Sequence, residues 1–486
     1  MSTTKASPMG AATLTTELWL GGRTAPAHSG STFPVHNPAT GALIAEVADA
    51  SARDAVHALE LAADAQRRWA DTAPRVRGEL LRAAFELLVS HTAEFAELIT
   101  LEMGKPLRES VAEVNYGAEF LRWFSEEAVR INGRNQVPPN GNGYLVTTKV
   151  PVGPVLAVTP WNFPLAMGTR KIAPALAAGC TIVIKPAEET PLTMLSLGQV
   201  FADAGRQPDV LSILPTTDPA AVVSPLLNDS RLRKLTFTGS TNVGKQLLRQ
   251  SADQLLRTSM ELGGNAPFLV FDDADIDAAV SGALAAKMRN GGQACTAANR
   301  FHVANSVIDE FTDKLVDAIG ALVVGNGDDP RTDVGPLISE RQRRTVSDLV
   351  ADAVQRGARV RVGGHPLDGA GYFYAPTVLD QIPADARLLA EEIFGPVAAV
   401  AGFDTEAEGI AAANRTEYGL ASYFYTRDLS RAARGAAQLQ SGMIGINRGV
   451  ISDAAAPFGG IKHSGFGREG GLEGIADYLE TKFVAT

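Results

Sequence analysis

Two cysteines are the strongest nucleophiles in this chain, and their surroundings differ. Cys180 opens the apolar run Cys-Thr-Ile-Val-Ile, where a cysteine is usually a small buried hydrophobic residue. Cys295 follows the glycine-rich stretch Asn290-Gly-Gly-Gln-Ala, which can direct backbone N–H groups at a thiolate or a developing oxyanion. A thiol's reactivity depends on its pKa and its exposure, so the loop favours Cys295 without deciding its role.

An acidic residue stands inside an apolar stretch at Met260-Glu261-Leu262. Most carboxylates lie on the surface or in ion pairs, and that reading of Glu261 stays open. If Glu261 instead lies in a pocket, desolvation raises its pKa and makes it a candidate general base.

Two polar segments follow apolar runs, and both are suited to binding a nucleotide. Phe237–Gly244 joins a predicted strand to a predicted helix, whose N-terminal N–H groups could hold a phosphate. Its spacing is Gly-x-x-x-x-Gly rather than Gly-x-Gly-x-x-Gly, so an ordinary turn is equally compatible. Lys185 and Glu188 follow another strand and could bind the hydroxyls of a ribose, unless they form a solvated charged loop.

Strand-like and helix-like runs alternate along most of the chain from residue 155 onward. The strand-like runs are short and mostly apolar, as in a parallel sheet covered on both faces. We therefore predict an α/β chain with a doubly wound, Rossmann-type nucleotide-binding fold. After short strands within Trp19–His36, the expected strands are Val155–Thr159, Thr181–Lys185, Val210–Leu214, Leu235–Thr238, Pro267–Phe271, Phe301–Val303, Val360–Val362, Val397–Phe403, Ser422–Tyr425, Met443–Ile446 and Tyr478–Ala485. The expected helices are Ser51–Trp69, Arg75–Met103, Arg108–Ile131, Met167–Ala178, Thr190–Ala204, Asn242–Gln254 and Ile276–Met288.

Composition excludes several classes of protein. The 486 residues include 44 Lys and Arg against 54 Asp and Glu, a net charge of −10 that argues against a nucleic-acid partner. Two cysteines cannot form a disulfide framework and fit a reducing compartment. Val150–Thr169 carries no charge but is broken by four prolines, so we expect a strand and a loop there rather than a membrane span. Met1–Thr16 lacks the apolar core of a signal peptide and reads as a frayed tail, so we expect a cytoplasmic protein.

Seven sequence blocks together resemble those of the aldehyde dehydrogenase superfamily. They occur in the same order as in that superfamily and at similar separations. The likeness extends from about Trp19 to the C-terminus. The blocks are Thr159-Pro-Trp-Asn-Phe-Pro164, Lys185-Pro-Ala-Glu188, Phe237-Thr-Gly-Ser-Thr241, Met260-Glu-Leu-Gly-Gly264, Gly292-Gln-Ala-Cys295, Glu392-Ile-Phe-Gly-Pro396 and Pro457-Phe-Gly-Gly460.

The resemblance implies a role for each matching residue. Cys295 would attack the aldehyde, Asn162 and the Cys295 N–H would stabilise the oxyanion, and Glu261 would activate water to hydrolyse the thioester. The residues implied to hold the dinucleotide are Trp161, Gly239 and Ser240 near the pyrophosphate, Lys185 and Glu188 on the adenosine ribose, and Glu392 and Phe394 on the nicotinamide riboside.

We expect NAD to be favoured over NADP. The carboxylate of Glu188 can accept hydrogen bonds from a free 2′-hydroxyl but would repel a 2′-phosphate. Some members with glutamate at this position accept both cofactors, and the segment Gln207–Asp218 lacks a glycine common in relatives, which leaves the adenine contacts open. The seven histidines show no ligand-like spacing, so we expect no metal.

Within the superfamily the chain is most similar to succinate-semialdehyde dehydrogenases. The resemblance implies that Arg170, Arg289 and Ser452 hold the substrate's carboxylate, a role that suits the bidentate geometry of arginine. An ordinary ion pair is the alternative for Arg289. Ala297 stands where some members carry a second cysteine, so we expect no disulfide switch.

Three alternatives to this reading remain. The chain could be a broad-specificity or glutarate-semialdehyde dehydrogenase, since a pocket discriminates weakly against one methylene. CoA-dependent acyl transfer fits less well, because a hydrolytic base is present at Glu261. A non-catalytic protein on this scaffold would be expected to lack Cys295, Glu261 or Asn162, and all three are intact.

The resemblance also implies three structural parts. An NAD(P)-binding domain would comprise residues 1–132 and 152–261, and an α/β catalytic domain residues 262–463. A small β oligomerisation arm would comprise residues 133–151 and 464–486, pairing the chain into a homodimer or homotetramer.

Overall fold

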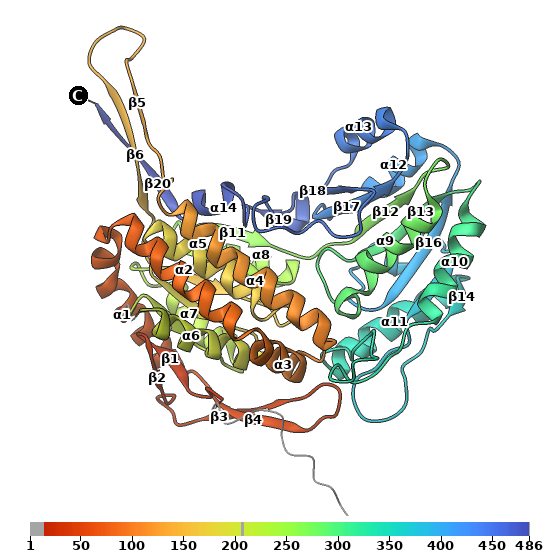
Figure 1. Ribbon diagram of the computed structural model, residues 1–486, viewed down its shortest axis with the longest axis horizontal. Coiled ribbons are helices and arrows are strands. Elements are labelled where there is room, and N and C mark those ends of the chain that lie inside the picture. Colours follow the sequence, from red (N-terminus) through yellow and green to blue (C-terminus); the bar gives the residue numbers. More distant parts are fainter. Residues whose placement is uncertain (1–13, 206–208, 486) are drawn as a thin grey trace, which may run out of the picture.

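The computed structural model describes residues 14–205 and 209–485, which form two sheet-centred lobes and a projecting arm (Figure 1). The tail expected to fray, Met1–Thr16, lies mostly outside the described residues. So does Gln207, the first residue of the segment Gln207–Asp218. The four sheets contain eight, seven, three and two strands. The α/β prediction is therefore confirmed, with most predicted strands found within one or two residues of their expected bounds.

The eight-stranded sheet has a parallel centre and antiparallel edges. Alternate residues of its strands enter different hydrophobic clusters: Val155 and Ala157 pack on one face, and Leu156 on the other. Helices cover both faces, as a doubly wound fold requires. In spatial order the strands are β19 (Gly465–Phe466), β11 (Arg257–Glu261), β10 (Lys234–Thr238), β7 (Val155–Val158), β8 (Ile182–Lys185), β9 (Leu211–Ile213), β1 (Leu18–Leu20) and β2 (Arg23–Ala25).

The helices of this lobe account for the long N-terminal part of the chain. Ser51 and Asp54 form the predicted capping box of the first helix. The expected helix Arg75–Met103 is two helices that break at His91, a boundary that no proline or glycine signals. The helices are α1 (Ala52–Asp71), α2 (Pro74–Ser90), α3 (Thr92–Met103), α4 (Leu107–Glu127), α5 (Ala166–Ala178), α6 (Pro191–Gly205), α7 (Pro219–Leu227) and α8 (Thr241–Ser251).

The seven-stranded sheet is parallel except at β14. Its strands, in spatial order, are β14 (Arg359–Val362), β15 (Thr377–Asp380), β16 (Val397–Phe403), β13 (Ala298–Ala304), β12 (Ala266–Val270), β17 (Ala421–Tyr425) and β18 (Met443–Ile446). Its helices are α9 (Ile276–Met288), α10 (Ile308–Gly320), α11 (Glu340–Arg356), α12 (Glu406–Asn414) and α13 (Leu429–Gln438), with 3-10 turns η1 (Arg289–Gly292) and η2 (Arg387–Leu389). Of these helices, only α9 was predicted from the sequence.

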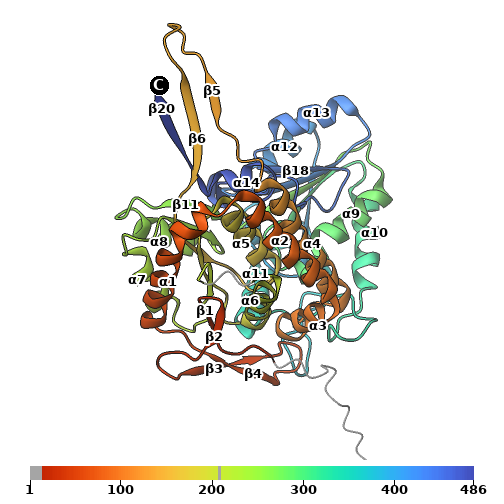
Figure 2. The ribbon, with the colours of Figure 1, turned by 60° about the vertical axis from the view of Figure 1, so that its left-hand side comes forward.

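Two smaller sheets stand outside the lobes. The hairpin of β3 (Thr32–His36) and β4 (Leu43–Ala48) packs under the first lobe, and α14 (Glu473–Ala476) leads from η3 (Lys462–Ser464) and β19 toward the arm. The arm joins β20 (Leu479–Ala485), β6 (Leu145–Pro151) and β5 (Arg134–Gln136). It stands clear of the body in two views 60° apart (Figure 2). Gly465–Phe466, within the stretch expected to form the arm, instead pairs with β11 in the first sheet.

The apolar stretch around residue 155 is strand and loop, since β7 ends at Val158 and α5 begins at Ala166. Among the described residues, no helix combines the length and the apolar character needed to cross a membrane.

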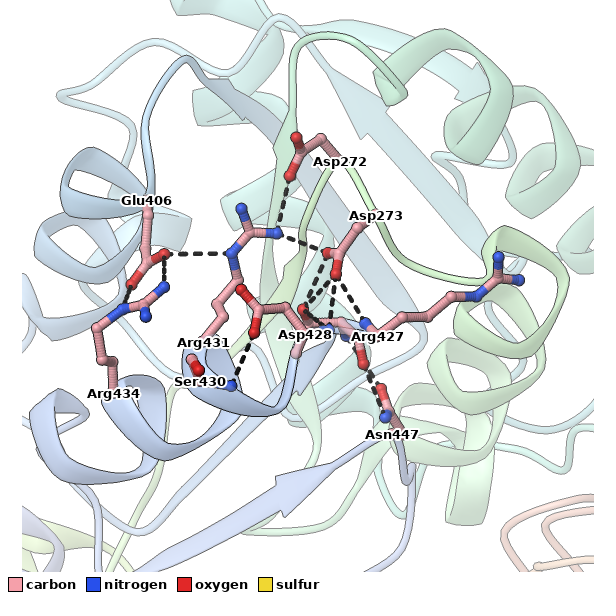
Figure 3. A network of polar contacts seen from close by, with 10 residues as sticks. Asp272, Asp273, Glu406, Arg427, Asp428, Ser430, Arg431, Arg434 and Asn447 are labelled. Atoms are coloured by element: carbon pink, nitrogen blue, oxygen red, sulfur yellow. Dashed lines mark hydrogen bonds and ion pairs between the residues drawn. The ribbon is translucent and has the colours of Figure 1, made fainter.

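A polar network fastens the outer helices of the second sheet to the turn after β12 (Figure 3). Arg431 on α13 lies 2.8 Å from Asp272, 2.6 Å from Asp273 and 3.2 Å from Glu406 of α12. Its side chain is only 18% exposed, so these charge-assisted contacts are partly shielded from water. One guanidinium therefore holds three carboxylates from two other segments together.

Replacing this guanidinium should loosen the second lobe. Arg431→Met leaves the three carboxylates facing one another, and we expect it to lower the free energy of unfolding by about 1–2 kcal/mol. The matched control is Arg427→Met, because Arg427 contacts only Asp275 by its side chain and both side chains are exposed. Urea unfolding measures the difference, and equal midpoints for the two variants would contradict this role of Arg431.

Candidate active site

A cavity of about 360 Å³ lies where the first sheet's strands end and the second lobe's loops approach them. The cavity is lined from both lobes, as expected at the carboxyl edge of a doubly wound sheet. The predicted site residues that line it are Trp161, Asn162, Gly239, Ser240, Cys295, Glu392 and Phe394.

The loop before Cys295 has an unusual backbone. Asn290, Gly291 and Gly292 all have φ between 55° and 74°, in the left-handed region that favours glycine. A methyl group on Gly292 would overlap the backbone of Gly395, and one on Gly264 would overlap the carbonyl oxygen of Cys295. The nucleophile loop is therefore in backbone contact with the Glu392 loop and with the segment after β11.

The two thiols differ in access but both are protonated at neutral pH. Burial raises the pKa of Cys295 to about 12, against the opposing charges of Arg170 and Arg289. Burial raises the pKa of Cys180 to about 11, and its Sγ donates to the Tyr478 carbonyl at 3.4 Å. Cys180 is 0% exposed, which fits the buried hydrophobic reading, while Cys295 lines the cavity.

Asn162 is fixed to the nucleophile loop. Its Nδ2 donates to the Gln293 carbonyl at 3.0 Å, and its own carbonyl accepts from Asn290 Nδ2 at 2.9 Å and from Lys105 Nζ at 2.8 Å. No described residue is hydrogen-bonded to its Oδ1. The amide thus lines the same cavity as the thiol and is tied to the segment that carries it.

Glu261 ends β11 as a buried carboxyl group. The residue is 4% exposed, and neither side-chain oxygen has a hydrogen-bond partner in the described chain. Burial, with the nearby charge of Glu469, raises the pKa of Glu261 well above its ordinary value, against the charges of Arg170 and Lys171. The surroundings therefore favour the neutral acid over the carboxylate, and a carboxylate formed here would be a stronger base than an exposed one.

Glu469 pairs with two of the cations whose charges act on Glu261. Lys171 Nζ lies 2.5 Å from one oxygen of Glu469 and Arg170 Nε 2.9 Å from the other. Burial opposes ionisation of Glu469, but Lys171 and Arg170 outweigh it and lower the pKa of that carboxyl. No local sequence signal pointed to Glu469.

The predicted substrate residues occupy two different environments. Arg170 is 1% exposed, pairs with Glu469, and lies 3.9 Å from the Phe458 ring centroid. Arg289 lies 5.4 Å from the Phe163 ring centroid; within the described chain its side chain makes no hydrogen bond or ion pair, and its charge acts on the buried carboxyl group of Glu109. Both charges act on Cys295 and on Tyr116.

Tyr116 of α4 is a residue that sequence reasoning missed. Its hydroxyl is buried and has no hydrogen-bond partner in the described part of the chain. Burial raises the pKa of Tyr116, against the charges of Arg170 and Arg289 and an interaction with Ser452. The three predicted substrate residues therefore lie around one tyrosine, although none of them lines the cavity beside Cys295.

The remaining cavity walls suit a dinucleotide. Ser240 lines the cavity and caps α8, so the N-terminus of that helix begins next to the cavity wall, where an anion could bind. Glu392 accepts from the Gly264 N–H at 3.1 Å, and burial raises the pKa of Glu392 to about 7. The rings of Trp161 and Phe394 meet edge to face with centroids 5.4 Å apart. Lys185 and Glu188 pair at 3.2 Å just beyond β8, outside the cavity wall.

Comparison with known proteins identifies the family. The model of the aldehyde dehydrogenase family matches residues 25–484. The chain belongs to the aldehyde dehydrogenase family. It is an aldehyde-oxidising oxidoreductase of a family that uses NAD or NADP.

Several relatives have informative names. A succinate-semialdehyde dehydrogenase of Paenarthrobacter nicotinovorans is 57% identical over 91% of this chain and 98% of its own. A glutarate-semialdehyde dehydrogenase of Pseudomonas aeruginosa is 48% identical over 94% of this chain and 95% of its own. A crystal structure of an NADP-dependent enzyme from E. coli superposes with a TM-score of 0.96 at 45% identity, covering 97% of this chain and 98% of that one.

Helix α11 contributes cavity residues that the sequence did not reveal. Arg341, Gln342 and Thr345 line the cavity, and Gln342 Nε2 donates to the Phe394 carbonyl at 3.0 Å. Their local pattern is that of an ordinary solvated helix face, so only the tertiary structure identifies them. In the described chain, no group of three or more His, Cys, Asp and Glu residues is placed to hold a metal ion.

The thiol chemistry of the cofactor-free enzyme follows from burial. Because the pKa of Cys295 is about 12, its alkylation by iodoacetamide should accelerate about tenfold per pH unit between pH 7 and pH 10. Peptide mass spectrometry follows Cys295, and unlabelled Cys180 serves as the internal control. A rate that levels off near the ordinary thiol pKa of about 8.5 would contradict the buried, protonated thiol.

Proposed function

We propose that this enzyme oxidises succinate semialdehyde to succinate with a nicotinamide dinucleotide, Cys295 being the nucleophile. The observation that carries the substrate class is Arg289, a guanidinium without an ion pair in the described chain, whose charge acts on a buried catalytic thiol. A carboxylate at the far end of a short aldehyde would give that cation its partner. The name of the Paenarthrobacter relative supports the same substrate.

The reaction begins at Cys295. Its sulfur, once deprotonated, adds to the aldehyde carbon and forms a thiohemiacetal, while the Nδ2 group of Asn162 and the Cys295 N–H stabilise the developing oxyanion. The bound dinucleotide supplies a hydride acceptor, so the carbon is left as a thioester. Asn162 reaches the oxyanion because Gln293, its present hydrogen-bond acceptor, lies two residues before the thiol.

Hydrolysis is assigned to Glu261. As a carboxylate it takes a proton from water, the hydroxide adds to the thioester carbon, and the C–S bond breaks to release the acid and the thiolate. Its raised pKa makes it a stronger base than an exposed carboxylate. The buried position also keeps bulk water away from the thioester.

The dinucleotide is assigned to the first lobe. In this assignment residues 1–132 and 152–261 form the cofactor domain and residues 262–463 the catalytic domain. Ser240, Gly239 and Trp161 hold the pyrophosphate, Glu392 and Phe394 the nicotinamide riboside, and Lys185 and Glu188 the adenosine ribose. We favour NAD because Glu188 would repel a 2′-phosphate, although Lys185 offsets part of its charge and the E. coli relative is described as NADP-dependent.

A dimer or tetramer is assigned to the arm. Strand β20 carries the exposed apolar residues Phe483 and Val484, exposed Tyr144 lies just before β6, and β20 has an unpaired edge in the three-stranded sheet. Exposed apolar strand edges are typical of surfaces that pair with another chain.

Substrate preference tests the proposal. We expect succinate semialdehyde to be oxidised faster than butanal or benzaldehyde, with NAD preferred to NADP, in an assay of reduced cofactor at 340 nm. Glutarate semialdehyde is the second candidate, because the Pseudomonas relative carries that name and one methylene is weakly discriminated.

Arg289→Ala should lower kcat/KM for succinate semialdehyde about 100-fold, through loss of charge-assisted hydrogen bonds, and leave butanal oxidation unchanged. Arg108→Ala is the matched control, since Arg108 is already paired with Asp333. Equal losses on both aldehydes would overturn the assignment of Arg289 to the substrate carboxylate.

Glu261→Gln should separate the two half-reactions. Because the amide cannot take a proton from water, we expect one equivalent of reduced cofactor in a rapid burst, followed by steady turnover slowed about 100-fold or more. Stopped-flow absorbance measures both phases, with Cys295→Ala as the control that gives no burst. An unchanged steady rate would exclude Glu261 as the base.

A further inference from the structure

Lys105 is a buried cation that touches the site without lining it. It is 2% exposed, and its Nζ contacts Glu113 at 2.5 Å, the Asn162 carbonyl at 2.8 Å and the Phe163 ring centroid at 4.0 Å. We infer that Lys105, with Glu113, is a positioning residue for the oxyanion donor Asn162 and for Arg289. This inference rests on the proposed roles of those two residues.

The pair holds both ends of the segment that carries the oxyanion donor. Lys105 fixes the carbonyl of Asn162, while Glu113 Oε1 accepts from the N–H groups of Leu165 at 3.0 Å and Ala166 at 3.2 Å. Those N–H groups stand at the start of α5 and would otherwise lack partners. A single buried ion pair thus spans the turn between β7 and α5.

The held carbonyl is also the link to the nucleophile loop. Asn290 Nδ2 donates both to the Asn162 carbonyl at 2.9 Å and to the Gln293 carbonyl at 3.0 Å. Asn162 Nδ2 donates to the same Gln293 carbonyl at 3.0 Å. Because these bonds share atoms, a displacement of the Asn162 backbone moves the oxyanion donor relative to Cys295.

The ring of Phe163 connects the same cation to the substrate arginine. Lys105 Nζ and Arg289 Cζ lie 4.0 Å and 5.4 Å from its centroid, within the range of cation–π attraction. Lys105 and Arg289 carry like charges and repel each other. Burial lowers the pKa of Lys105, the charge of Arg289 adds to that effect, and Glu113 opposes it more strongly than Arg289 contributes. Phe163 therefore couples the position of Arg289 to that of the loop that Lys105 fixes.

Stability alone does not require this arrangement. Burying two charges costs desolvation, and a well-packed neutral pair of similar size is often as stable. A variant that neutralises both partners is therefore expected to fold while losing the fixed position of Asn162. A loss of activity in a variant that still folds would therefore report on positioning rather than on stability.

The test is a double-mutant cycle with whichever aldehyde the wild-type enzyme oxidises best. The variants are Lys105→Met/Glu113→Gln, Asn162→Ala, and the combination of all three changes. We expect the neutralised pair to lower the burst rate constant about 10-fold and Asn162→Ala about 100-fold. Because Lys105 acts through Asn162, the combined variant should stay within about twofold of Asn162→Ala alone.

Additive losses in that cycle would overturn the inference and leave the proposed reaction standing. A full-rate Asn162→Ala enzyme would remove the oxyanion role itself, and the inference with it. NADH binding followed by fluorescence should have an unchanged Kd in the variant Lys105→Met/Glu113→Gln, since neither Lys105 nor Glu113 lines the cavity. A rise in Kd that matches the fall in burst rate would also overturn it, because it would indicate general loosening.

A matched control identifies purely structural loss. Arg77 is another buried cation that donates to backbone carbonyls, to Ala177 at 3.0 Å and Thr72 at 2.6 Å, far from the cavity. Arg77→Met should lower the melting temperature and leave the burst rate constant of the folded enzyme unchanged. The single variant Lys105→Arg, which keeps the charge, should recover part of the lost rate; no recovery together with additive losses would overturn the positioning role.

Discussion

No side chain fits between Gly264 and the carbonyl oxygen of Cys295, and the site depends on that close approach. Gly264 follows the last strand of the first sheet's parallel centre, and Cys295 precedes β13 at the centre of the second. The Gly264 N–H donates to Glu392, so a third loop is fixed by the same residue. One glycine thereby joins the segment after β11 to the loops of Cys295 and Glu392, and both of those residues line the cavity.

Burial raises the pKa of three acidic groups in and around the site. Cys295, Glu261 and Glu392 all have raised pKa values, and desolvation is the largest cause for each. Two of the cations that act on them, Lys171 and Arg170, are paired with Glu469. A charge introduced with substrate or cofactor should therefore change the pKa values of these groups strongly, because little bulk water and few free counter-charges screen it.

The sequence was informative where function depends on local pattern. Apolar runs located β7, β8 and β10, and the glycines around Cys295 separated it from Cys180, which the structure buries completely. The resemblance supplied the roles, which a lone Gly-Gln-x-Cys could not. The break at His91 escaped because no proline or glycine marks it. The helices α10 to α13 were not predicted, although Ser339 and Gly357 cap α11 and a capping box begins α12 at Thr405.

What escaped in the site depends on contacts between distant residues. Glu469 reaches Lys171 across 298 positions, and Tyr116 meets Arg170 and Arg289 from a helix with unremarkable spacing. Lys105 and Glu113 are eight positions apart, yet their effect is exerted on Asn162, 57 positions from Lys105. Such couplings follow from how helices pack on a sheet, which local sequence pattern does not specify.

The two arginines implied to share one task differ in available charge. Arg170 has a buried carboxylate partner at 2.9 Å, so a substrate carboxylate there would have to compete with Glu469 for a guanidinium that is already neutralised. Arg289 has no ion pair in the described chain: it lies against the Phe163 ring, and its charge acts on the buried carboxyl group of Glu109. In the proposed reaction, the substrate carboxylate would therefore meet less competition at Arg289 than at Arg170. Arg170 is better placed to hold Glu469, whose charge raises the pKa of Glu261.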